Sequence, residues 1–144
     1  MATQENRAGT DIDRPDGRVL AIVERGHRGA LEKQFFDEFY LAAELHRQLG
    51  GLDILLRGQA VTYALNAGPP PPLRIGNRTV GTLSDPRKGL RTLIEAGVGV
   101  WAEEPGLAAV GAAHSPGRLL DGIRVAQDGE LATRWTGYRM VCFL

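Results

Sequence analysis

The sequence predicts an α/β domain with a mainly parallel sheet, because short apolar runs alternate along the chain with segments of helical periodicity. Three runs, residues 19–23, 52–56 and 98–102, are almost continuously apolar, which is typical of strands covered on both faces. Weaker apolar segments near 123–125 and 138–143 complete a set of five strands. Parallel strands joined by right-handed crossovers end at one edge of the sheet, and ligands bind at that edge.

The chain before the first strand is predicted to be a flexible tail. Residues 1–17 are polar, and Ile12 is their only large apolar residue after Met1. Residues 18–144 are expected to form a single domain with a substantial core. The tail has no apolar signal core, and no stretch approaches the roughly 20 apolar residues that span a bilayer. We therefore expect a cytoplasmic protein with no membrane partner.

Helical patterns follow the predicted strands. After the first strand, apolar residues recur three or four positions apart until Gly50 and Gly51 end the predicted helix. The members of this pattern are Leu31, Phe35, Phe39, Ala42, Leu45 and Leu49. Pro86 begins another helix, capped by Ser84 or Asp85. Further helices are predicted over residues 60–66, 103–110 and 128–135.

A proline-rich segment, residues 68–85, interrupts the alternation. Four consecutive prolines predict a stiff extended piece, and Gly76 with Asn77 predicts a small hairpin within residues 74–83. Long connections are more often functional or interface-forming than idle. Together with the apolar circumference of the first predicted helix, this segment leads us to expect a homo-oligomer.

Composition excludes several classes of function. The formal net charge is zero, which argues against binding nucleic acid through a broad basic face. The single cysteine, Cys142, permits neither an intrachain disulfide nor a multi-cysteine metal site. The three histidines lack metal-ligand spacing. No phosphate loop or dinucleotide fingerprint is present, so no cofactor is expected.

Several motifs resemble the DsrE/DsrF-like family, which includes the TusB, TusC and TusD sulfur-relay proteins. They are residues 54–61, residues 93–100 with Leu107 and Gly111, residues 122–125, residues 130–132, and Gly137 with Tyr138. The resemblance covers most of the chain from Arg18 onward. It implies a three-layer α/β/α sandwich with a mainly parallel five-stranded sheet, and assembly into dimers, trimers or hexamers.

The resemblance also marks a departure at residue 103. In the family members that carry sulfur, a persulfide-accepting cysteine follows the third strand, four residues before the leucine and eight before the glycine. Leu107 and Gly111 place that position at Glu103. Because persulfide transfer needs a nucleophilic thiolate, a carboxylate cannot perform it. The chain is therefore not expected to carry a persulfide there.

The polar residues at the strand ends form the predicted site. Glu103, Glu24 and His27 are candidates for proton transfer, since a carboxylate or a carboxylate–histidine pair in a crevice can act as acid and base. Alternatively, these charges only stabilise helix ends in solvated loops. Arg57 and Arg25 are candidates for binding an anionic substrate. Further binding candidates are Gln59, Tyr63 and Trp101, although such aromatic residues more often belong to a core or an interface.

Two functions remain open at this point. The first is a DsrE-like small-molecule-binding protein, which is an enzyme if Glu103 performs acid–base chemistry in the crevice. The second is a non-catalytic scaffold subunit of a sulfur-relay-type assembly. The sequence names neither the substrate nor the reaction. A Glu103 that faces a closed pocket beside a second ionisable group favours the first, and a solvent-exposed Glu103 favours the second.

Overall fold

The computed structural model describes residues 17–26, 37–68, 71–81 and 85–144. The predicted tail, except for Gly17, and the first part of the first predicted helix lie outside the described residues. A parallel five-stranded sheet in the order β6-β5-β2-β1-β7 forms the centre. Its strands are β1 (Val19–Val23), β2 (Leu52–Leu56), β5 (Gly99–Glu103), β6 (Ile123–Ala126) and β7 (Met140–Phe143). This sheet confirms the predicted fold class.

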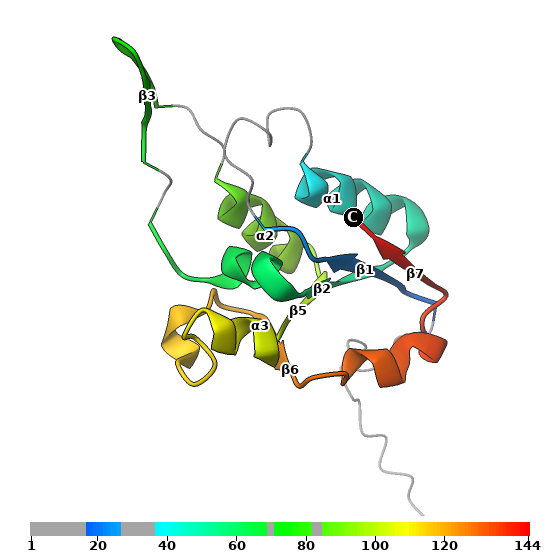
Figure 1. Ribbon diagram of the computed structural model, residues 1–144. Coiled ribbons are helices and arrows are strands. Elements are labelled where there is room, and N and C mark those ends of the chain that lie inside the picture. Colours follow the sequence, from blue (N-terminus) through cyan, green and yellow to red (C-terminus); the bar gives the residue numbers. More distant parts are fainter. Residues whose placement is uncertain (1–16, 27–36, 69–70, 82–84) are drawn as a thin grey trace, which may run out of the picture.

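Helices cover the first face of the sheet. They are α1 (Glu38–Leu49), the 3₁₀ helix η3 (Gly58–Ala64), α2 (Pro86–Glu95) and α3 (Glu104–Ala109). Asp37 caps α1 and Asp85 caps α2 through their side chains, and Pro86 begins α2 as predicted. Alternate strand residues such as Ala21, Ile54 and Val100 point towards these helices and form the larger core cluster. Figure 1 shows α1 and α2 together on this side.

The second face carries a smaller core and a shorter cover. Leu20, Leu55 and Trp101 belong to this cluster, and the 3₁₀ helix η5 (Leu131–Gly137) packs against them through Leu131. In Figure 1 the orange segment that contains η5 lies across the sheet from α1 and α2. The two faces are therefore covered unequally, and the second face leaves room for a pocket.

Two predicted helices are 3₁₀ helices with shifted bounds. The helix expected at 60–66 begins at Gly58, whose φ of +52° turns the chain at the end of β2. The helix expected from residue 128 begins only at Leu131. Its start is delayed because the Glu130 side chain accepts a hydrogen bond from the Gln127 amide and closes a turn first. Glu103 also differs from the prediction, since it pairs with Ala126 as the last residue of β5.

The proline-rich segment contains the predicted hairpin. Its strands β3 (Leu73–Ile75) and β4 (Arg78–Val80) pair antiparallel around Gly76 and Asn77, and they extend away from the sheet (Figure 1). A short 3₁₀ helix, η4 (Pro116–Arg118), precedes β6. In the described part of the chain, no helix is long and apolar enough to cross a membrane.

Candidate functional site

Three charged side chains from the ends of neighbouring strands meet at the carboxyl edge of the sheet. Glu24 follows β1, Arg57 follows β2, and Glu103 ends β5. The Nε atom of Arg57 donates to Oε2 of Glu103 at 2.7 Å, and its Nη1 atom donates to Oε1 of Glu24 at 3.1 Å. The structure therefore brings together three of the residues that the strand-end rule selected.

The pleat of the strands explains why these side chains share one side of the sheet. Val23, Leu56 and Ala102 belong to the larger core on the first face. Because successive side chains alternate, the residue after each of them is directed towards the second face. Arg57 is further fixed by its backbone amide, which donates to the carbonyl oxygen of Val23 at 2.9 Å.

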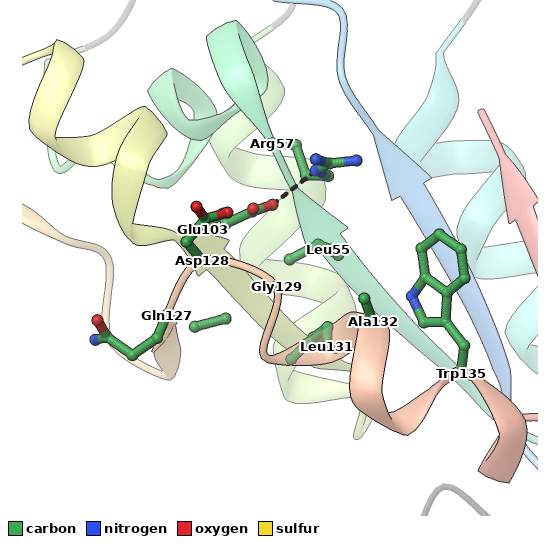
Figure 2. A pocket seen from close by; sticks show the side chains of 10 residues that line it. Leu55, Arg57, Glu103, Gln127, Asp128, Gly129, Leu131, Ala132 and Trp135 are labelled. Atoms are coloured by element: carbon green, nitrogen blue, oxygen red, sulfur yellow. Dashed lines mark hydrogen bonds and ion pairs between the residues drawn. The ribbon is translucent and has the colours of Figure 1, made fainter.

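A pocket of about 160 Å³ opens beside the Arg57–Glu103 pair on the second face. Its lining includes the ends of β2, β5 and β6, the loop that follows β6, and η5. The lining residues are Leu55, Arg57, Glu103, Ala126, Gln127, Asp128, Gly129, Leu131, Ala132 and Trp135. Figure 2 shows Arg57 and Glu103 joined at one end of the pocket and Trp135 on η5 beyond Leu131 and Ala132.

The members of the charged group differ greatly in exposure. The Glu103 side chain is 10% exposed, whereas Arg57 is 39% and Glu24 is 51% exposed. A nearly buried carboxylate is costly unless it is paired and hydrogen-bonded. Arg57 satisfies this requirement for Glu103 and leaves the carboxylate in the pocket wall.

Comparison with known proteins supports the fold. No protein-family model and no curated protein matches the sequence. Among solved structures, the YchN protein from E. coli superposes with a TM-score of 0.69 at 21% identity, over 88% of this chain and 98% of its own. MTH1491, a protein of unknown function from Methanobacterium thermoautotrophicum, gives 0.59 at 17% identity, over 88% and 99%.

The chain has a DsrE-like fold. The fold that the sequence resemblance implied is thus confirmed, because both neighbours have the DsrE/DsrF-like fold. Identities of 21% and 17% establish the fold alone, so function has to be argued from the site.

The other predicted site residues lie outside the pocket or outside the described residues. His27 is in the latter group. Arg25 and Gln59 are exposed and do not line the pocket, although Gln59 lies close to Gly26 near the Glu24 end.

Two predicted aromatic residues occupy the two cores of the DsrE-like fold instead. Tyr63 packs edge-on against Phe39, with ring centroids 5.1 Å apart. Burial raises the pKa of its phenol, and the charge and hydrogen bond of Glu38 raise it further. Trp101 is buried on the second face, with the Arg124 guanidinium 5.3 Å from its ring centroid.

Sequence reasoning missed a buried polar cluster on the second face. Asp53, 1% exposed, accepts a hydrogen bond from the Tyr138 hydroxyl at 2.8 Å and pairs with Arg18 at 2.8 Å. The available signal was one acidic residue inside an otherwise apolar strand. Sequence reasoning also missed the pocket wall, which is formed by the loop that follows β6 and by η5 itself. No pattern in residues 127–135 indicates what these residues pack against.

Proposed function

We propose that this protein binds a small molecule in the pocket at the carboxyl edge of its sheet, and that Glu103 is the group that acts on the bound molecule. One observation carries the proposal. The Glu103 carboxylate lies in the wall of a pocket of about 160 Å³, is almost buried, and is hydrogen-bonded to a second ionisable group, Arg57. Concave sites with an apolar lining and a few convergent polar groups are typical of ligand sites.

The position of the Glu103 side chain argues against a role limited to the end of a helix. Glu103 is the N-cap residue of α3, yet its side chain makes no capping hydrogen bond. It turns instead to Arg57. A carboxylate that only stabilised the helix end would be expected near the free amides of the first turn.

The chemistry open to this pair is proton transfer. A carboxylate in the wall of a pocket can accept a proton from a bound molecule and return it, provided that the two lie within hydrogen-bond reach. A guanidinium does not exchange protons in such a reaction, so the role of Arg57 is to orient Glu103 through their hydrogen bond. Glu24 holds the other side of the guanidinium and keeps Arg57 in place.

A persulfide relay at this site would lack its thiolate, because the cysteine of the chain lies elsewhere in the sheet. Cys142 is the only cysteine of the chain and lies on β7, three strands from β5 in the order β6-β5-β2-β1-β7. Three steps of about 4.8 Å put roughly 14 Å between the strands. Cys142 also packs with the core of the first face, whereas the pocket is on the second.

The alternative is a non-catalytic scaffold subunit of a sulfur-relay-type assembly, and one observation favours assembly with a further copy of the chain. On the edge strand β7, Phe143 is 62% and Met140 is 43% exposed. Exposed apolar side chains on an edge strand suit contact with another chain. Light scattering at micromolar concentration tests this part, and a clean monomer would rule out the homo-oligomer.

Nuclear magnetic resonance tests the binding proposal directly. A fragment library is screened against the full chain by recording ¹H–¹⁵N correlation spectra. The proposal expects hits whose largest amide shifts cluster on Gln127, Gly129 and Leu131. If every hit maps instead to the exposed edge at β7, or if none is found at millimolar concentration, the binding proposal is wrong.

A further inference from the structure

We propose that the ligand of this pocket is a small organic cation, an ammonium or amidinium group attached to an apolar body about the size of one six-membered ring. This inference rests on the proposed function, namely that the pocket binds a small molecule. It adds the chemical class of that molecule. Two observations support the inference. One is the charge of the group formed by Glu24, Arg57, Glu103 and Asp128, here called the rim, and the other is the size of the apolar part of the pocket.

The rim carries an excess of negative charge. Among the described residues that line the pocket or pair with its lining, Glu24, Glu103 and Asp128 are carboxylates near the strand ends, and Arg57 is a guanidinium. Arg134, the arginine of η5, pairs with Glu130 at 3.5 Å and does not line the pocket. Within this group the three carboxylates outnumber the one guanidinium, so the group attracts a cation that enters the pocket.

Arg57 is poorly placed to bind an anion, although the sequence made it a candidate for that role. Its Nε and Nη1 atoms already donate to two carboxylates. An incoming carboxylate or phosphate would bring a further negative charge against the Glu103 side chain, which is only 10% exposed. Like charges at a poorly solvated position repel each other strongly, so the rim selects against anions.

The interior sets the size and polarity of the rest of the ligand. The apolar part of the pocket lining consists of Leu55, Ala126, Leu131, Ala132 and Trp135. An apolar cavity of about 150 Å³ holds one benzene molecule. The pocket has a volume of about 160 Å³, so one ring of that size fits. Trp135, which is 37% exposed, offers an indole surface to the ring or to the cationic group.

A matched ligand series separates charge from shape. Benzylamine, benzyl alcohol and benzoate share the ring and differ mainly in the charge of the polar group. Each is titrated into the full chain while the amide signals of Gln127, Gly129 and Leu131 are followed. We expect benzylammonium to bind about tenfold more tightly than benzyl alcohol, because its hydrogen bonds are charge-assisted. Benzoate is expected to bind more weakly than either, and added salt should weaken only the binding of benzylammonium.

Two variants locate the charge that selects the cation. Glu103→Gln and Asp128→Asn should each reduce the preference for benzylammonium over benzyl alcohol several-fold, and leave the affinity for the alcohol nearly unchanged. Glu104→Gln is the matched control, because Glu104 is the neighbouring acid and does not line the pocket. An equal loss of affinity for both ligands in the two test variants would contradict a charge-selective site.

The outcomes distinguish this inference from the proposed function. If benzoate binds as well as or better than benzylammonium, or if all three compounds bind equally, the cation inference is overturned while small-molecule binding stands. If none of the three, nor any fragment of the screen, shifts the pocket amides at millimolar concentration, the proposed function is wrong and the inference is overturned with it.

Discussion

Replacement of Tyr138 by phenylalanine should destabilise the fold measurably, because Tyr138 completes a buried polar cluster. Its hydroxyl donates to Oδ2 of Asp53 at 2.8 Å, and Asp53 is 1% exposed. Without the hydroxyl, Oδ2 loses this donor, while Oδ1 keeps its contact with Arg18 at 2.8 Å. Hydrogen bonds to charged groups contribute about 1.5–3 kcal/mol, so we expect the free energy of unfolding to fall by about 2 kcal/mol.

Urea denaturation followed by circular dichroism measures this loss, with Tyr40→Phe as the control. Tyr40 is 69% exposed, so its replacement should change stability by less than about 0.5 kcal/mol. For a domain of this size, 1 kcal/mol corresponds to about 2–4 °C, so Tyr138→Phe should lower the melting temperature by roughly 4–8 °C. A Tyr138→Phe protein as stable as the Tyr40→Phe control would refute the energetic role assigned to the cluster.

Titration and substitution of single residues test other parts of the structure. Burial and the charge of Asp53 raise the pKa of Tyr138 above its ordinary value of 10.0, so the folded protein keeps the phenol proton to a higher pH than the unfolded chain does. The free energy of unfolding should therefore fall as the pH rises above about 10. The fall should be less steep in Tyr138→Phe, which lacks this proton. Gly106→Ala should lower the free energy of unfolding, measured in urea, by about 1–3 kcal/mol, because the added Cβ would lie 2.7 Å from Val61 and 3.0 Å from a backbone oxygen. Gly117→Ala is the control and should change it little, since a Cβ at Gly117 meets nothing within 4 Å. Burial raises the pKa of the half-buried Cys142 thiol, so at neutral pH Cys142 should react with Ellman's reagent more slowly than free cysteine, and faster as the pH rises. If a compound is found that the protein converts, Glu103→Gln should lower its turnover about 10²–10⁴-fold in a steady-state assay, and an unchanged rate would exclude Glu103 as the acid or base.

The sheet could be predicted because its signals are local. The runs that became β1 and β2 are apolar throughout or nearly so, and their bounds agree with the structure. The start of α2 was also readable, because a capping Asp85 followed by Pro86 is a local signature. The third strand was placed one residue early, because its last residue, Glu103, is charged and its pairing with Ala126 lies outside any local pattern.

The candidate site could be predicted in part. Strand ends in a parallel sheet converge, so Glu24, Arg57 and Glu103 could be grouped before any distance was known. The ion pairs that join them could not be predicted, because hydrogen bonds from one guanidinium to two carboxylates depend on distances between strands. The pocket wall at Trp135 could not be predicted, because the short helix that carries it has no periodic apolar pattern and depends on contacts with the sheet.

The most direct test of the central claim is to fill the pocket without changing its charge. Ala132 lines the pocket and Thr133, its neighbour on η5, does not, so Ala132→Phe blocks the pocket and Thr133→Phe adds the same ring outside it. The dissociation constant of the best fragment hit is measured by calorimetry for both variants, after their folds are checked by circular dichroism. We predict at least a tenfold weaker affinity for Ala132→Phe and an affinity close to wild type for Thr133→Phe. Equal affinities in the two variants would contradict the claim that ligands bind in this pocket.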